Sequence, residues 1–136
     1  MSPYEQIMQY AHDHNIHIHP QAIAGMLAMA FRASGESVVA IDAGALDSGA
    51  AQAVALAHEI GHLETGTLRN THSQYVPIGK DEHKAIAWSV KQLLPKRRLY
   101  AALDKCQGRT WEVAEELDLP QWFVNQAIEY YEKVKS

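Results

Sequence analysis

Two histidines and a glutamate, in the stretch AHEIGHL at residues 57–63, have the types and spacing of a metal site. His58 and His62 are four residues apart, so a helix places both imidazoles on one face, where they suit one tetrahedral Zn²⁺ ion. Glu59 projects about 100° around the helix, which lets it reach a water on the metal without binding the metal. This is the geometry of the HExxH peptidases, in which zinc acidifies the water and the glutamate takes its proton.

A catalytic zinc ion normally keeps three protein ligands and one open position for water, so a third ligand is required. The extended HExxHxxGxxH pattern does not supply it, because Leu68 occupies the last histidine position. Glu82 is the better candidate, since it begins a predicted helix that would pack against the motif helix. His72 could reach the metal only if its loop folds back. Asp81 and His83 are adjacent alternatives to Glu82.

Apolar spacing and turn residues predict the elements that must position these side chains. We expect helices over residues 4–13, 21–31, 48–64, 81–94, 96–104, 110–117 and 120–134. One short strand is expected at residues 37–42, where β-branched residues lie between Gly35 and Gly44. The predicted fold class is mostly α (α+β), with one small β element and C-terminal helices. We expect a single domain over residues 1–136, with a core at about 21–95 and a C-terminal helical part at about 96–136.

Composition narrows the class of protein. The chain has 136 residues, enough for one domain with its own apolar core. Its net charge of −4 does not favour broad attraction to nucleic acid or to anionic lipid. The sequence has no apolar run of membrane-spanning length, its first residues lack a secretory signal pattern, and Cys106 has no partner for a disulfide. We therefore expect a cytoplasmic protein that does not contact membranes.

Three blocks of the sequence together resemble the ImmA/IrrE family of small metallopeptidases, found in phages, mobile elements and stress regulators. The blocks are ALAHEIGHLETG, EHKAIAWSVKQLLP and TWEVAEELDLPQWFVNQAIEYY, and they follow the family's order and spacing over roughly residues 50–134. Ser89 stands where the family usually has Ala, and Ile86 where Asn or Asp is common. The resemblance implies a compact zincin-like metallopeptidase domain, in which the motif helix packs against the helix that bears Glu82.

The resemblance also implies an activity. One Zn²⁺ per chain would be held by His58, His62 and Glu82, with Glu59 as base and then proton carrier. The implied reaction is hydrolysis of a peptide bond in a regulatory protein, namely the helix-turn-helix repressor of a phage or mobile element. That repressor is the expected partner. A non-catalytic zinc protein that binds a repressor or toxin is the alternative.

Several further residues are candidates for contacts with the substrate. His72, Tyr75 and His83 lie in or beside the loop that faces the site, and one of them could stabilise the oxyanion. The strand at residues 38–41 could bind an extended substrate by edge pairing. The histidine-dense stretch His12–His19 is interpreted as a helix end and turn leading into Pro20 with exposed rings, and metal binding there is the alternative.

Residues 110–134 have the layout of a DNA-binding helix-turn-helix, which provides a third hypothesis, a DNA-binding regulator. The predicted first helix carries Glu112, Glu115 and Glu116, and the second helix has no arginine, so this face would repel DNA. Direct binding to nucleic acid is therefore not expected. Four aromatic residues are interpreted as core residues at helical spacing: Trp88, Trp111, Trp122 and Phe123.

Overall fold

The computed structural model describes residues 1–21, 27–42, 44, 46, 48–68 and 78–134. In chain order the elements are α1 (Pro3–Asp13), β1 (Ile16–Pro20), β2 (Ala28–Ala33), β3 (Glu36–Ile41), α2 (Gly49–Glu64), α3 (Ile78–Leu93), α4 (Lys96–Lys105), α5 (Thr110–Leu117) and α6 (Gln121–Lys133). The prediction of a mostly helical α+β fold with a small β element is confirmed. Within these ranges, every helix is too short or too polar to cross a membrane.

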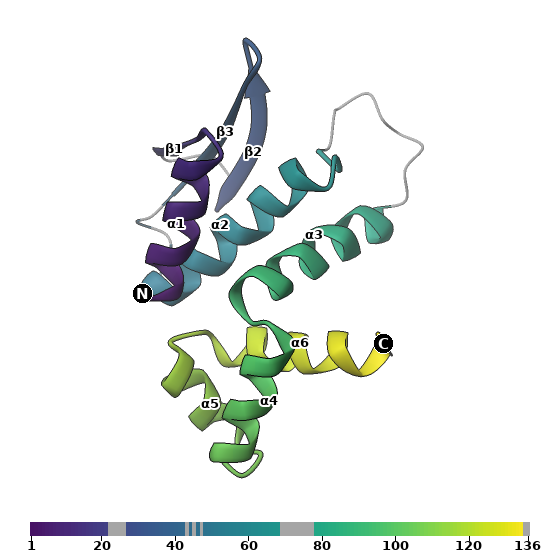
Figure 1. The fold of residues 1–136 in the computed structure, drawn as a ribbon. Coiled ribbons are helices and arrows are strands. Elements are labelled where there is room, and N and C mark those ends of the chain that lie inside the picture. The colour runs from purple at the N-terminus through teal and green to yellow at the C-terminus, as the bar shows by residue number, and fades with distance from the viewer. Residues whose placement is uncertain (22–26, 43, 45, 47, 69–77, 135–136) are drawn as a thin grey trace.

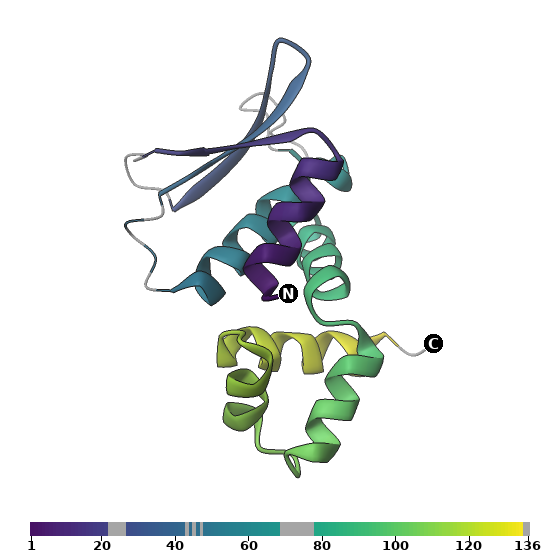
Figure 2. The same ribbon diagram turned by 60° about the vertical axis from the view of Figure 1, so that its left-hand side comes forward.

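The three strands form one small sheet in the order β1-β3-β2. β1 runs parallel to β3, and β2 runs antiparallel to it, with Ala30 opposite Val39. β2 and β3 form a hairpin whose two turn residues, Ser34 and Gly35, both have positive φ, as a type I′ turn requires. The helices α1 and α2 lie on one face of the sheet (Figures 1 and 2), where they share an apolar cluster with Val39 and Ile41 of β3.

The helices α2 and α3 lie side by side and antiparallel (Figure 1). They come close together at Gly61, where a Cβ atom would lie 2.8 Å from the backbone oxygen of Ala85. That distance is shorter than real Cβ contacts, so only glycine permits this packing. Because Glu82 lies one turn before Ala85, the close approach also brings the Glu82 side chain toward the motif helix.

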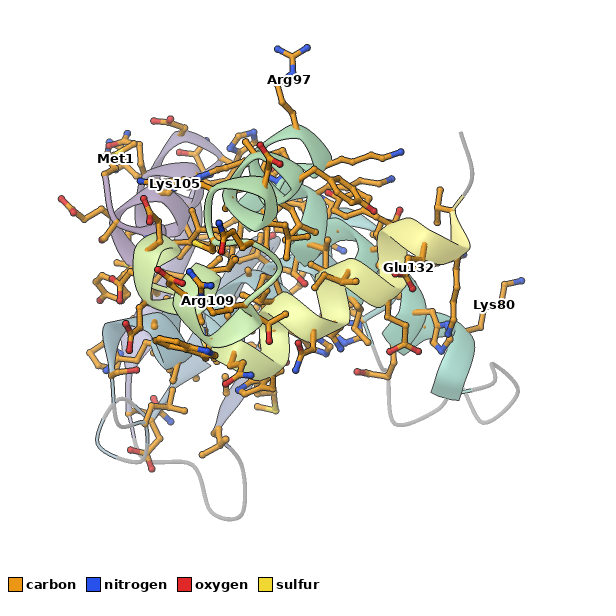
Figure 3. All side chains as sticks on the ribbon, turned by 90° about the horizontal axis from the view of Figure 1, so that it is seen from below. Met1, Lys80, Arg97, Lys105, Arg109 and Glu132 are labelled. Carbon is orange, nitrogen blue, oxygen red and sulfur yellow. The ribbon has the colours of Figure 1, made fainter. Side chains whose placement is uncertain are left out.

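The C-terminal helices α4, α5 and α6 form a group below α3 (Figure 2). Phe123 and Val124 of α6 are fully buried and belong to the same apolar cluster as Leu93 and Leu94 at the end of α3. The Tyr131 hydroxyl donates a hydrogen bond of 2.8 Å to the Leu94 carbonyl. Charged side chains such as Arg97 extend outward from this part of the chain (Figure 3).

Two of the predicted elements differ from the observed ones. Residues 28–31, predicted as the end of a helix, form part of β2, and residues 22–26 of that predicted helix lie outside the described residues. Pairing with β3 overrides the helical preference of this Ala- and Met-rich segment. Residues 16–20, predicted as a turn, form β1. The alternation of Ile and His there has the period of a strand, and the histidine rings are exposed as predicted.

The prediction that all four aromatic residues of the C-terminal blocks are core residues is wrong for two of them. Phe123 is fully buried, but Trp111 and Trp122 are 53% and 58% exposed. Neighbouring residues of a helix point about 100° apart, so the core face of α6 takes Phe123 and leaves Trp122 outside it.

Candidate metal centre

Three side chains from α2 and α3 converge in the structure: His58, His62 and Glu82. Their ligand atoms all lie within 4.8 Å of one another, and this is the one such group of three or more in the described residues. His58 Nε2 lies 2.8 Å from Glu82 Oε2, and His62 Nε2 lies 3.0 Å from Glu82 Oε1. The three predicted ligands are therefore close enough to hold one metal ion.

The sequence of the motif helix explains where the helix starts and which of its faces is buried. The Ser48 hydroxyl accepts a hydrogen bond of 3.1 Å from the Ala51 N–H, which caps the N-terminus of α2. Ala53, Ala57 and Ile60 are fully buried along one face of the helix. This burial fixes the rotation of α2, so that His58 and His62 face the side where Glu82 lies.

The His62 imidazole is held at its other nitrogen by Thr67. His62 Nδ1 lies 3.1 Å from the Thr67 carbonyl oxygen and 3.0 Å from the Thr67 hydroxyl. A carbonyl oxygen can only accept, so Nδ1 carries a hydrogen, and Nε2, which faces Glu82, is the nitrogen left to bind a metal. This is the arrangement in which a metal-binding histidine is oriented by an outer hydrogen bond.

The turn that ends α2 builds this contact. Gly66 has φ +68°, and the N–H groups of Gly66 and Thr67 donate to the carbonyls of Leu63 and His62, which makes a Schellman motif. The motif turns the chain back, so that Thr67 lies against the ring of His62. Sequence reasoning missed Thr67. The available signal was the glycine directly after the motif helix, which predicts such a turn.

Glu59 lies beside the three ligands but is not one of them. Its Oε1 accepts a hydrogen bond of 3.0 Å from the Ala30 N–H on β2. Burial raises the pKa of the Glu59 carboxyl above its ordinary value, although the imidazoles of His58 and His62 and the Ala30 N–H act in the opposite direction. A partly buried carboxylate with a raised pKa beside a metal site suits a group that takes up and releases a proton.

The other predicted site residues are not brought to the metal centre. His72 and Tyr75 lie outside the described residues. His83 is exposed on α3 and lines a separate cavity with Glu129 and Tyr130 of α6. Asp81 is buried but does not belong to the group of ligands. Of the alternatives to Glu82 that the structure describes, neither takes its place.

The prediction that residues 38–41 act as an edge strand is wrong. These residues belong to β3, which pairs on one side with β1 and on the other with β2, so its backbone groups are already used. The strand beside the metal centre is β2, which pairs only on the β3 side within the described sheet. The Ala30 N–H points away from β3, toward Glu59. By the alternation of an antiparallel pair, Ala28 and Arg32 also direct backbone groups outward.

Two cavities meet at Glu59. The larger, of about 650 Å³, is lined by His58 and Glu59 and extends along α2 toward α6. The smaller, of about 280 Å³, is lined by Glu59, His62, Glu82 and residues of β2. The described part of the centre is thus open on two sides along the outer edge of β2.

A comparison with family models, curated proteins and solved structures finds no match to this chain. The class that the structure defines is therefore an α+β protein with a His/His/Glu group able to bind a metal ion. The resemblance to the ImmA/IrrE family stays a prediction that depends on the three sequence blocks.

Proposed function

We propose that this chain is a zinc-dependent endopeptidase of the ImmA/IrrE type, which hydrolyses a peptide bond in a regulatory protein. The observation that carries the proposal is the placement of Glu59 beside the group formed by His58, His62 and Glu82. A purely structural zinc site is closed by four protein ligands and has no use for a carboxylate beside it. Here three ligands converge, and the Glu59 carboxylate lines the same cavity as His62 and Glu82.

The donor set fits zinc. Two imidazole nitrogens and one carboxylate oxygen form a known catalytic zinc set, and the Thr67 contact at Nδ1 leaves Nε2 as the metal-binding nitrogen of His62. His58, His62 and Glu82 would hold the ion. When bound, zinc would lower the pKa of a water molecule and polarise the carbonyl of the scissile bond.

Glu59 is the proton carrier in this proposal. Its carboxylate takes a proton from the attacking water and then delivers it to the nitrogen of the leaving amine. The Ala30 N–H holds Oε1 at 3.0 Å, which leaves the other carboxylate oxygen to face the reacting water.

The outer edge of β2 is the proposed binding site for the peptide backbone. An extended peptide can pair with the outward groups of Ala28 and Arg32 and with the Ala30 carbonyl, while the Ala30 N–H stays on Glu59. Backbone pairing recognises an extended chain and not a particular sequence. It would place the peptide across Glu59, because Ala30 is the residue that contacts Glu59.

The proposed substrate is a helix-turn-helix repressor, and this part of the proposal depends on the family resemblance. The test is co-expression of this chain with helix-turn-helix proteins encoded by neighbouring genes, followed by gel analysis. We expect the wild-type chain to cleave the repressor and Glu59→Gln to lose cleavage while it keeps its zinc and its fold. The matched control is Glu132→Gln, at an exposed position on α6 (Figure 3).

Complex formation and a gel shift with operator DNA separate the two alternatives. A non-catalytic partner of the repressor would form a complex without cleavage, and Glu59→Gln would bind equally well. A DNA-binding regulator would shift operator DNA in a gel at moderate salt. The surface of α5 and α6 does not favour the latter, because Glu115 and Glu116 are exposed and Lys133 pairs with Glu129 at 2.9 Å.

A further inference from the structure

The larger cavity begins at the reacting groups and continues along one face of the motif helix. His58 and Glu59 line one end, and the floor consists of Ala51, Val54 and Ala55. These residues precede His58 by seven, four and three positions, so they lie on the same face of α2 as a metal ligand. Two of the three are alanines, and their small side chains leave the depth of the cavity open. Its volume of about 650 Å³ is in the range of sites that bind small ligands or side chains.

The walls of this cavity come from distant parts of the chain. Leu27 and Ala28 contribute from the start of β2, Ile86 and Ser89 from α3, and Trp122 from α6. Leu27 is 52% exposed and Trp122 is 58% exposed, and both belong to the few large apolar side chains that the described residues leave in solvent. Exposed apolar side chains gathered around one cavity indicate a binding surface.

The direction of β2 determines which cavity lies before and which lies after the scissile bond of a bound peptide. Leu27 borders only the larger cavity, whereas Phe31, further along β2, borders only the smaller one. Antiparallel pairing is slightly more stable per residue than parallel pairing and repeats the pairing of β2 with β3, so a bound peptide runs from the Phe31 end of β2 to the Leu27 end. With the scissile bond at Glu59, the residue that follows this bond therefore lies at the larger cavity.

We propose that the larger cavity receives a bulky apolar side chain, from the residue that directly follows the scissile bond, and that Trp122 is a specificity-determining residue for it. The proposal rests on the proposed endopeptidase function. Its substrate class is peptides with Leu, Met, Phe or a similar side chain at that position. Trp122 supplies a flat apolar wall, so the C-terminal helices take part in substrate selection and not only in the core.

The test uses the zinc-loaded full chain and a library of internally quenched peptides that vary at the positions on both sides of the cleaved bond. Cleavage sites are read by mass spectrometry. Trp122→Ala removes one wall, and Ala55→Leu fills the floor. Trp111→Ala is the matched control, because Trp111 is 53% exposed on α5 but does not line the cavity. Circular dichroism and zinc content verify that each variant is folded and loaded.

We expect the wild-type chain to prefer bulky apolar residues after the cleaved bond over Ala or Asp by at least about tenfold in kcat/KM. Trp122→Ala and Ala55→Leu should each reduce kcat/KM for the bulky substrates by about tenfold or more, and leave peptides with Ala at that position unchanged. Trp111→Ala should match the wild type. Calorimetry measures binding of the best peptide to proteins that carry Glu59→Gln and therefore do not cleave it. Adding Trp122→Ala or Ala55→Leu to this protein should weaken binding, and adding Trp111→Ala should not.

The outcomes that contradict each proposal differ. If the zinc-loaded wild type cleaves no peptide and no repressor, the proposed endopeptidase function fails. If it cleaves peptides without an apolar preference after the bond, or with a preference that Trp122→Ala and Ala55→Leu leave intact, the function stands and the assignment of the cavity fails. An apolar preference before the bond would overturn the proposed direction of the peptide.

Discussion

The His62 imidazole is fixed at both of its nitrogens, and this sets which of them can bind a metal. Thr67 accepts from Nδ1 with its carbonyl and its hydroxyl, while Nε2 faces Glu82 at 3.0 Å. The Thr65 hydroxyl lies 2.8 Å from that of Thr67 and donates to the Gly61 carbonyl at 2.7 Å. A short chain of hydroxyl groups thus connects the metal ligand to the backbone of its own helix. These contacts fix the orientation of the ring and leave Nε2 as the nitrogen that can bind a metal.

Replacement of Thr67 by Val should weaken zinc binding. Valine keeps the shape of the side chain but removes the hydroxyl that orients His62, and such changes typically cost 10–100-fold in metal affinity. We expect a loss of about tenfold, because the Thr67 carbonyl remains as an acceptor. Competition with a chromophoric chelator measures the affinity. Thr67→Ser keeps the hydroxyl and should bind like the wild type. Equal affinities for the valine and serine variants would contradict the role given to the hydroxyl.

Replacement of Glu82 by Ala should have a larger effect. Glu82 offers both carboxylate oxygens to the two imidazoles, and its loss leaves two ligands in place of three. We expect the affinity for zinc to fall by more than about a hundredfold, beyond the effect of a group that only orients a ligand. Elemental analysis after dialysis measures the zinc content. The control is Glu132→Ala, on the surface of α6, which should retain one zinc per chain. If Glu82→Ala also retains one zinc per chain, the third ligand lies elsewhere and this assignment is wrong.

At the scale of the elements, the site depends on how closely α2 and α3 pack. Gly61 lies between the two histidines of the motif, and its missing side chain lets the backbone of α3 come close at Ala85. A longer distance between these helices would withdraw Glu82 from both imidazoles. The glycine in the middle of HEIGH therefore has a packing function that is separate from the chemistry of its neighbours.

Replacement of Gly61 by Ala should destabilise the fold. Alanine normally stabilises a helix relative to glycine by up to about 1 kcal/mol. At this position its Cβ would lie 2.8 Å from the Ala85 oxygen, so the helices must shift, at a cost of about 1–3 kcal/mol. Urea unfolding measures the free energy of unfolding. Gly49→Ala, also in α2, meets Tyr4 at an ordinary 4.0 Å and should be neutral or more stable. Similar results for the two variants would contradict the close-approach argument.

The helices could be predicted from the sequence far better than the strands could. The apolar residues of α2 recur up to Leu63, and both ends carry their own signals, the Ser48 cap and Gly66. For this reason the spacing of His58, Glu59 and His62 is enough to assign all three to one helix. β2 lacks such signals, because Ala and Met have little preference for strands and the pairing with β3 decides its conformation. Thr67 was missed because its role depends on a backbone turn and not on residue type.

At the scale of the whole molecule, one apolar cluster joins the N-terminal elements to the C-terminal helices. Ile7 of α1, Val39 of β3, Leu94 at the end of α3 and Phe123 of α6 all belong to it and are almost fully buried. The Gln6 side chain also donates a hydrogen bond of 2.8 Å to the Gln92 carbonyl, which connects α1 to α3. We therefore expect substitutions in α6 that reach this cluster to affect the stability of the entire chain.

Two adjacent aromatic residues of α6 test this expectation. Phe123→Ala should reduce the free energy of unfolding by about 3–5 kcal/mol, because Phe123 is fully buried and its removal leaves a cavity. Trp122→Ala should change stability by less than about 1 kcal/mol, since Trp122 is 58% exposed. Far-ultraviolet circular dichroism and tryptophan fluorescence should give the same urea midpoint for each variant. Separate midpoints would indicate that the C-terminal helices unfold independently.

Gly66 is exposed, touches neither the proposed ligands nor the core, and yet has a backbone conformation that favours glycine. A survey of natural or engineered variants that ranks positions by solvent exposure would classify this one as tolerant. Any residue with a side chain would instead strain the reversal of the chain and move the group that steadies His62. Loss of function on substitution of Gly66 would then indicate that the metal centre is required, and genetic data could show this without any measurement of metal binding.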